Sequence, residues 1–451
     1  MQNFINRSWS SILFWISLAL LFLFSAFPGK GGFEGGQREI STLSLRNDNW
    51  GFLTPFYFGG FPDLNGYWRI TLVTIQITGL WLGIYLLVRD LDFSRTYRKL
   101  LFLIFIVVSS VFGSQLWRDS TLFCYVILGL GLIKLGLTWD KRINFVIITL
   151  GIMVLTFGLM FKPIYSVLFV IFIIILIIEK FEAKQIFGVA LLMALILPIT
   201  PYVIDKNLSM KFNLQEVYPE QQPMIYDMAA LYCWGNTDKS REEASRALRI
   251  VLAPTAKLSS VCSFQILTSW DSLHTNRPDW DISAPVIRIV NDDDKLNHFK
   301  NLWFKTILYN FRDYVMAKKP FLAEVLTMAN SFVRTEFSGF NAFPILNKMN
   351  SLSWEILYYF AVIFDKLRIL TVGFALSFFI GYFYFKALKR KNPIRLHLLG
   401  MISEILLFLN LILLSVIGTV AYVANNGRYV LPTILTTWLF FFRSIFKLKS
   451  H

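Results

Sequence analysis

Apolar residues in this chain gather into unbroken runs of about 16 to 25 residues, without the alternation of apolar and polar positions that marks a membrane strand. A helix of this length spans the ~30 Å hydrocarbon core of a bilayer. The pattern therefore predicts an all-α polytopic membrane protein of about ten transmembrane helices. The runs are Ile12–Phe27, Tyr67–Val88, Leu100–Trp117, Leu122–Trp139, Phe145–Phe161, Ile164–Ile178, Ile186–Ile204, Ile369–Phe385, Leu398–Val423 and Tyr429–Ile445.

The composition agrees with this interpretation. Of 451 residues, 55% are hydrophobic and 16% are charged, and the mean hydropathy of +0.54 is far above that of a water-soluble domain. The chain also has 44 Phe, 18 Tyr and 13 Trp, which excludes a disordered chain because so much aromatic surface does not stay in water.

The net charge of +15 sets the orientation of the helices. Lys and Arg gather in alternate short loops, after helices 2, 4, 6 and 8 and at both termini, and loops of this kind stay on the cytoplasmic side. We therefore expect a multi-pass plasma (inner) membrane protein with both termini in the cytoplasm. No basic face on a soluble domain is interleaved with aromatics, so no nucleic acid partner is expected. A cleaved signal peptide is the alternative for Ile12–Phe27.

Two of the outward segments are long. Residues 1–204 hold helices 1 to 7 with a long first outer loop at 28–66, residues 205–368 form a mainly helical extracytoplasmic domain, and residues 369–451 hold helices 8 to 10. In the domain, Ser240 followed by Glu243 predicts a capping box at the start of a helix. Residues Ser353–Leu367 are expected to form an aromatic helix at the membrane interface.

Cys233 and Cys262 both fall in the extracytoplasmic domain, whereas Cys124 lies inside helix 4. An oxidising compartment favours a disulfide between the first two, and closing a loop of about 30 residues would stabilise the domain by about 3–4 kcal/mol. Two free thiols are the alternative. The sequence has no CxxC or HExxH spacing, so no structural zinc or haem site is expected.

Polar residues are sparse within the spans and gather at the outer mouth. Lys134 lies near enough to the inner end of helix 4 to snorkel. Glu404 in helix 9 either pairs with a loop cation such as Arg395 or has a functional role. At the outer mouth, the first loop, the end of helix 3 and the start of helix 10 contribute charged and polar residues. These are Glu34, Gln37, Arg38, Glu39, Arg46, Asp48, Arg118, Asp119, Arg428 and Tyr429.

This set suits the transfer of a sugar from a lipid phosphate. A carboxylate can accept the proton of an acceptor hydroxyl, and arginines can hold the phosphate leaving group through bidentate hydrogen bonds. The alternative is that these interfacial residues only anchor helix ends.

The order of these features resembles the GT-C superfamily of polytopic glycosyltransferases, which use polyprenyl- or dolichyl-phosphate sugars, and in particular its uncharacterised bacterial branch. In that family a Pro-Gly after helix 1 precedes an acidic residue and a Gln, as Pro28-Gly29, Glu34 and Gln37 do here. A Trp-x-Asp-Ser follows helix 3, matched by Trp117–Ser120. An Arg-Tyr opens the last helix, matched by Arg428-Tyr429.

The outer domain resembles the same bacterial proteins in two segments. One is QQPMIYDMAALYCW, residues Gln221–Trp234, with Asp227 in the shared Asp-Met-Ala core. The other is LWFKTILYNFRDYVMAKKP, residues Leu302–Pro320, with a Trp followed by a Lys-Pro pair. Asp227 is also placed as a helix N-cap would be, directly before an apolar run, and we prefer that interpretation.

The resemblance implies an inverting transfer of one sugar from a polyprenyl-phosphate carrier to a cell-surface glycan or lipid acceptor, on the extracytoplasmic side. Glu34 would be the general base, and the family more often has Asp there, so Asp48 and Glu39 are substitutes. Asp119 would position the acceptor or a divalent cation, which some members need and others do not. No soluble cofactor is implied.

The resemblance also implies binding roles. Arg428 would bind the donor phosphate, with Arg118 and Arg38 as weaker candidates, and Gln37, Tyr429 and Trp117 would contact the acceptor or sugar. An interfacial belt is the default explanation for the tryptophans, including Trp234 and Trp303.

Two rival functions remain open. A transporter or flippase for a lipid-linked glycan predicts polar residues deep in several helices and internal symmetry, neither of which the sequence has. A non-catalytic surface-polysaccharide assembly protein is the second, because the first loop departs from the family pattern at Glu34.

Overall fold

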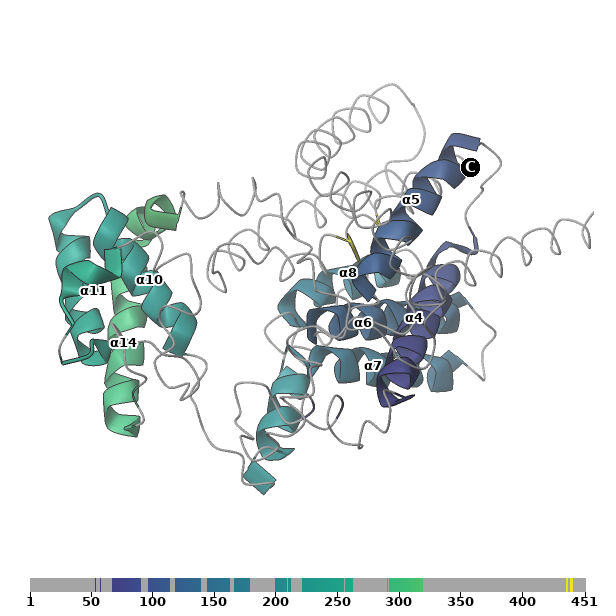
Figure 1. The fold of residues 1–451 in the computed structure, drawn as a ribbon, viewed down its shortest axis with the longest axis horizontal. Helices are drawn as coiled ribbons and strands as arrows, with labels where there is room; N and C mark the ends of the chain where they lie inside the picture. The colour runs from purple at the N-terminus through teal and green to yellow at the C-terminus, as the bar shows by residue number, and fades with distance from the viewer. Residues whose placement is uncertain are drawn as a thin grey trace, which may run out of the picture.

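The computed structural model of the chain describes two groups of helices (Figure 1). The described residues are 53, 57, 67–90, 96–113, 118–138, 144–162, 166–178, 199–208, 210–211, 221–254, 256–262, 290, 292–318, 435–436 and 439–440. Within these residues all regular structure is helical, as the apolar pattern predicts.

The first group comprises five apolar helices: α4 (Tyr67–Val88), α5 (Thr96–Gly113), α6 (Arg118–Thr138), α7 (Asn144–Leu159) and α8 (Ser166–Ile178). Two of them are long and apolar enough to cross a membrane, α4 over Thr71–Val88 and α6 over Arg118–Thr138, and α7 is a shorter apolar helix. These helices agree with the predicted membrane protein, and the full set of about ten spans stays a prediction.

The boundaries of α4 coincide with the predicted run, whereas α6 begins four residues before the predicted Leu122. The polar Arg118-Asp119-Ser120-Thr121 segment therefore belongs to the first turn of α6 and not to a loop. Of the last predicted run, residues 435, 436, 439 and 440 are described, and the Phe440 ring lies 4.9 Å from that of Phe172 in α8. The runs Ile12–Phe27, Ile369–Phe385 and Leu398–Val423, and the interfacial segment Ser353–Leu367, lie outside the described residues.

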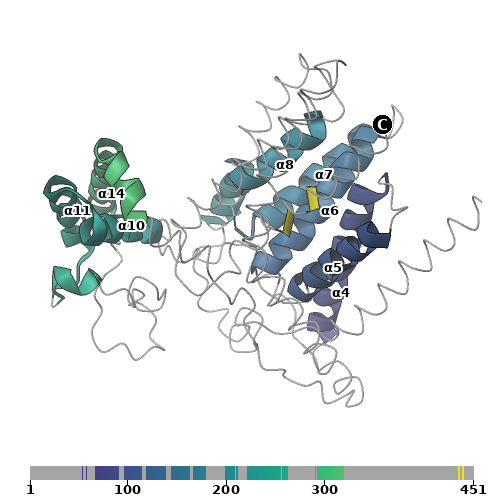
Figure 2. The same cartoon turned by 90° about the horizontal axis from the view of Figure 1, so that it is seen from above.

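Helix α6 lies between α4 and α7 (Figure 2), and glycines allow the three backbones to approach closely. A Cβ on Gly83 of α4 would lie 2.5 Å from the carbonyl oxygen of Ile127 in α6. A Cβ on Gly129 of α6 would lie 2.8 Å from the carbonyl oxygen of Gly151 in α7. In lipid no hydrophobic force draws helices together, so close packing at small residues is the main source of association.

The second group packs around one hydrophobic core, with α10 (Gln221–Trp234) at its centre. Around it lie α11 (Asp238–Val251), the 3₁₀ helix η6 (Leu258–Cys262), α14 (Asp293–Tyr309) and a short helix at 311–318. Helix α11 buries one apolar stripe, formed by Ala244, Ala247, Leu248 and Val251, and exposes its charged face.

The start of α11 corrects one prediction. Its N-cap is Thr237, whose side chain accepts a hydrogen bond from the Ser240 amide, so Ser240 is not the capping residue. The Ser240 hydroxyl instead donates to the Thr237 carbonyl, which places it inside the first turn. Thr and Ser are both good caps, so the choice between them depends on where the preceding chain turns.

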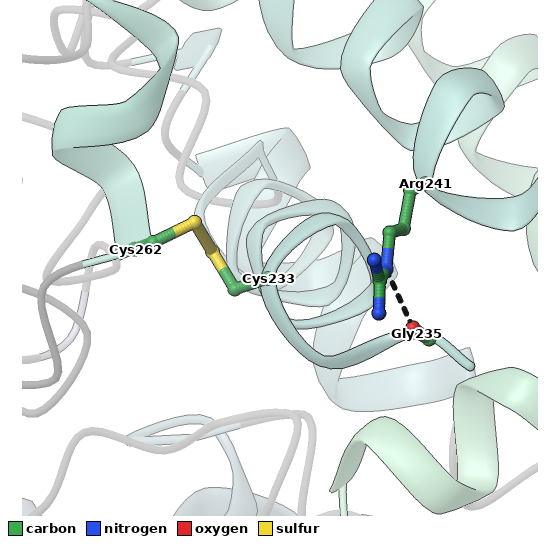
Figure 3. Close-up of a disulfide and its surroundings, with 4 residues drawn as sticks. All are labelled: Cys233, Gly235, Arg241 and Cys262. Atoms are coloured by element: carbon green, nitrogen blue, oxygen red, sulfur yellow. Dashed lines mark hydrogen bonds between the residues drawn. A yellow bond between two sulfur atoms is a disulfide. The ribbon is translucent and has the colours of Figure 1, made fainter. Parts of the chain in front are cut away.

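Two connections tie further chain to the ends of α10. At its C-terminal end, Cys233 and Cys262 form a disulfide with the Cα atoms 5.3 Å apart (Figure 3). Beside it, the Arg241 Nε donates to the Gly235 carbonyl at 2.7 Å, which holds the turn between α10 and α11. At the N-terminal end, the Gln221 side chain accepts from the Val290 amide at 2.9 Å and donates to the Val290 carbonyl at 2.6 Å.

We predict that Gly83→Ala lowers the stability of the protein, because the added methyl group meets rigid backbone. Overpacking of this kind costs about 1–3 kcal/mol. Thermal melting in detergent, followed by tryptophan fluorescence, measures the change. Gly79→Ala is the matched control, because its Cβ would meet only the end of the Leu128 side chain at 3.3 Å. Equal melting temperatures for the two variants would contradict the backbone contact between α4 and α6.

Candidate functional site

The candidate site begins with a buried ion pair where α6 starts and α7 ends. Asp119, in the first turn of α6, is completely buried, and its Oδ1 lies 2.6 Å from the Nζ of Lys162. Lys162 follows α7 directly, in a tight turn in which its amide donates to the Leu159 carbonyl. The pair therefore joins two helices that are adjacent in space and antiparallel.

The helix termini favour these two charges. The N-terminus of a helix carries a partial positive charge that stabilises Asp119, and the C-terminus of α7 carries a partial negative charge that stabilises Lys162. Burial strengthens their mutual attraction but removes both from water, so each charge depends on the other.

A separate hydrogen-bonded cluster also begins in the first turn of α6. Two residues after Asp119, the Thr121 hydroxyl accepts a bond from the Gln76 amide of α4 at 2.6 Å. The same amide group donates to the Tyr57 hydroxyl at 3.3 Å, which in turn lies 3.1 Å from the Tyr125 hydroxyl. Gln76 and Thr121 are both fully buried, so this cluster is a polar interior between apolar helices.

Tyr57 connects the first outer loop to this cluster. Its ring makes edge contacts with Phe161 at 5.1 Å, Tyr125 at 6.1 Å and Phe157 at 6.3 Å between centroids. One described residue of the 28–66 segment is thus fixed against α6 and α7, next to the Asp119–Lys162 pair.

The structure describes two of the predicted site residues, apart from the disulfide cysteines. Asp119 is in the buried ion pair, and Arg118 opens α6 and is partly exposed. The other predicted site residues lie outside the described residues: Glu34, Gln37, Arg38, Asp48, Trp117, Arg428 and Tyr429. Within the part of the chain that is described, no three His, Cys, Asp or Glu side chains gather as metal ligands, and a divalent cation stays a prediction.

The sequence analysis did not identify five members of the site. These are Lys162, Gln76, Thr121, Tyr57 and Tyr125. Two signals were present: Gln76 is a lone amide in an otherwise apolar stretch, and Lys162 is a lone cation between two apolar runs. Neither signal names a partner, because the partners come from other helices.

A second ion pair, between a buried lysine and an exposed aspartate, lies at the opposite end of α6. Lys134 pairs with Asp90, which follows α4, and also donates to the Leu87 carbonyl at 2.9 Å. Its side chain is only 3% exposed, so it does not snorkel into water as predicted but is neutralised in place. Asp119 and Lys134 are 15 residues apart on one helix, or about 22 Å.

In the second group of helices, Asp227 is the centre of a buried polar cluster and is not a helix cap as predicted. It lies in the interior of α10, six residues after the helix begins, so the free amides of the first turn are out of its reach. Its carboxylate pairs with Lys318 at 2.5 Å and accepts bonds from the Trp303 indole at 3.0 Å and the Tyr314 hydroxyl at 3.3 Å. The two segments that carry the family resemblance therefore meet at this residue.

Two pKa shifts fit these contacts. Burial, with the nearby charge of Asp227, raises the pKa of Tyr314 well above its usual value, so Tyr314 remains a hydrogen-bond donor. Hydrogen bonds from the Thr237 hydroxyl and amide hold the pKa of Asp313 below its usual value. Asp313 thus fastens the helix at 311–318 to the start of α11 in its ionised form.

Comparison with known proteins found no match: no family model matches the chain, and no curated protein or solved structure matches it significantly.

We predict that Lys318→Met strongly destabilises the outer domain, because it leaves the Asp227 carboxylate buried without a countercharge. Breaking a buried pair in this way costs about 3–5 kcal/mol. Hydrogen exchange of residues 221–318 in the full-length protein measures the loss of protection. Lys295→Met is the control, because Lys295 is an exposed lysine of the same domain. Unchanged exchange in Lys318→Met would mean that the Asp227 cluster does not hold the core together.

Proposed function

We propose that this chain is a multi-pass plasma-membrane glycosyltransferase of the GT-C type, with about ten spanning helices and both termini in the cytoplasm. It moves a sugar from a polyprenyl-phosphate carrier to a cell-surface glycan or lipid on the extracytoplasmic side. The donor's prenyl tail lies in membrane lipid among the helices, so both substrates meet at the outer mouth.

One observation carries the proposal: the buried Asp119–Lys162 pair beside the Tyr57–Gln76–Thr121–Tyr125 cluster. An ion pair with neighbouring hydroxyl and amide groups suits a phosphate on one side and a sugar hydroxyl on the other. Lysine is a common phosphate ligand, and carboxylates accept hydrogen bonds from sugar hydroxyls. Tyr57 supports a role for the first outer loop, because it fixes part of that loop against this end of α6.

The reaction follows from these roles. The acceptor hydroxyl oxygen attacks the anomeric carbon of the donor, forming the new glycosidic bond while the bond from that carbon to the phosphate oxygen breaks. The phosphate leaves with the electron pair, held by Arg428 and by Lys162. The proton of the acceptor hydroxyl passes to Glu34, with Asp48 and Glu39 as substitutes.

Asp119 acts through position. Its carboxylate is held by Lys162, and when the donor phosphate draws Lys162 toward itself, Asp119 becomes available to orient the acceptor or a divalent cation. Arg118 and Arg38 add positive charge near the phosphate, and Gln37, Tyr429 and Trp117 contact the sugar or acceptor. An exchange of ion-pair partners of this kind leaves neither charge unpaired in the membrane.

A non-catalytic role in surface-polysaccharide assembly is the second candidate. The complete burial of Asp119 favours it, because a saturated ion pair that only fastens α6 to α7 would look the same. A flippase for lipid-linked glycans would also be compatible with an ion pair that only fastens α6 to α7.

We expect Glu34→Gln to lower transfer activity by about 10²–10⁴-fold, the usual contribution of a catalytic acid or base, and Asp119→Asn to abolish transfer because the acceptor is no longer oriented. The measurement is mass spectrometry of surface glycans and lipid-linked sugars in cells with the protein intact, deleted or substituted. Loss of one sugar from the glycan, with accumulation of its polyprenyl-phosphate donor, is the expected result in the deletion strain and both substituted strains.

Asp90→Asn is the matched control. It leaves the buried Lys134 of α6 without its countercharge at the opposite end of the helix, although Asp90 itself is exposed, and transfer should continue. A glycan lost only on deletion, with both substituted strains normal, would favour the assembly or flippase role.

A further inference from the structure

One side of the outer domain exposes large apolar side chains. Six side chains between positions 304 and 316 are each at least 46% exposed: Phe304, Leu308, Tyr309, Phe311, Val315 and Met316. Single exposed apolar residues are ordinary, but a contiguous set of this size marks an interaction surface.

These side chains form a stripe that runs over both helices. Phe304 and Leu308 lie four residues apart on one face of α14, and Phe311 and Val315 lie four residues apart on one face of the helix at 311–318. The opposite face is already occupied, because Thr306, Tyr314 and Ala317 are buried in the domain. Helix α14 and the helix at 311–318 are therefore apolar on two sides, and one side packs in the core.

The corner between the two helices is held firmly. The Asn310 amide donates to the Thr306 carbonyl, and the Tyr314 amide donates to the Asn310 carbonyl, so helical hydrogen bonding continues through the corner. The Asn310 side chain donates to Glu243 of α11 at 2.6 Å. The stripe is therefore presented by a fixed backbone.

The charges beside the stripe are positive. Lys305 and Arg312 are exposed next to it, and Lys300 is partly buried one turn before. The only carboxylate between positions 300 and 318 is Asp313, which is buried and faces Thr237. The acidic group Asp292–Asp294 is at the far end of α14, at least 11 residues or about 16 Å from Lys305.

An apolar stripe flanked by cations is complementary to the surface of an anionic bilayer, where apolar side chains enter the acyl boundary and cations meet headgroup phosphates. The domain is also tethered near such a surface. The 10 residues from the helical residue 211 to Gln221 reach at most about 35 Å, so the local concentration of lipid is high.

We propose that this stripe docks on the anionic lipid surface of the leaflet from which the domain emerges. Phe304, Leu308, Phe311 and Val315 enter the acyl boundary, and Lys305 and Arg312 pair with lipid phosphates. A bilayer fits better than a protein partner because the flanking charges have one sign and match a uniform anionic surface. The proposal needs the membrane helices but does not rest on the transferase activity.

The test places a nitroxide spin label at Phe311→Cys in a Cys124→Ala background of the full chain, which keeps the Cys233–Cys262 disulfide. The protein is reconstituted into vesicles of phosphatidylglycerol with phosphatidylcholine. We expect the label at position 311 to collide more with oxygen, which concentrates in lipid, than with a water-soluble nickel chelate. A label at Arg249→Cys, an exposed position in the last turn of α11, is expected to collide more with the nickel chelate than with oxygen.

Charge reversal separates lipid from other occupants. Lys305→Glu with Arg312→Glu should shift the label at position 311 toward nickel accessibility in phosphatidylglycerol vesicles. A label at position 311 as accessible to nickel as the one at position 249 would overturn the proposal. A label shielded from both reagents would also overturn it, because a protein surface would then cover the stripe.

Discussion

The close approach of backbones at glycine sets how α4, α6 and α7 pack and therefore which of their polar groups meet. Gly83 against Ile127 fixes the register of α4 on α6, and Gly129 against Gly151 fixes that of α7 on α6. With these registers, Gln76 comes level with Thr121, and Lys162 comes level with Asp119. Because hydrophobic burial does not distinguish one register from another in lipid, the small residues make that choice.

The ion pairs of α6 follow from this packing. An isolated charge in a bilayer is costly, and here each buried charge of α6 faces an opposite charge from a neighbouring helix end. The pair at the Lys134 end is shielded from the proposed substrates by the length of the helix, whereas the pair at the Asp119 end lies beside hydroxyl and amide groups. An ion pair thus holds α6 against the end of α4 at one end of the helix and, in our proposal, takes part in sugar transfer at the other.

The sequence was informative where the structure depends on local pattern. The apolar run Tyr67–Val88 coincides with α4, and the placement of two cysteines in one outward segment indicated their disulfide. It failed where the structure depends on tertiary contact. Asp227 resembled a helix cap because an apolar run follows it, but α10 begins earlier, at Gln221, which bonds to Val290 far along the chain.

The same contrast between local pattern and tertiary contact applies to the candidate site. Asp119 stands out in the sequence because a carboxylate at the edge of an apolar run is unusual, and the structure places it in a buried ion pair. Its partner Lys162 could not be identified, because the meeting of one helix start with another helix end depends on packing between helices. Ser240 was misplaced by three residues for a related reason: the cap at Thr237 is held by Asp313, a residue from a different helix.

The two attachments at the ends of α10 have a consequence for the divergence of this protein. Cys262 is bonded to one end of α10 and Val290 to the other, so the chain between them is anchored on the core at both of its ends. The free energy of closing a loop between two fixed points rises only slowly with its length. Mutation can therefore change the number of residues between these two anchors at little cost to the described core.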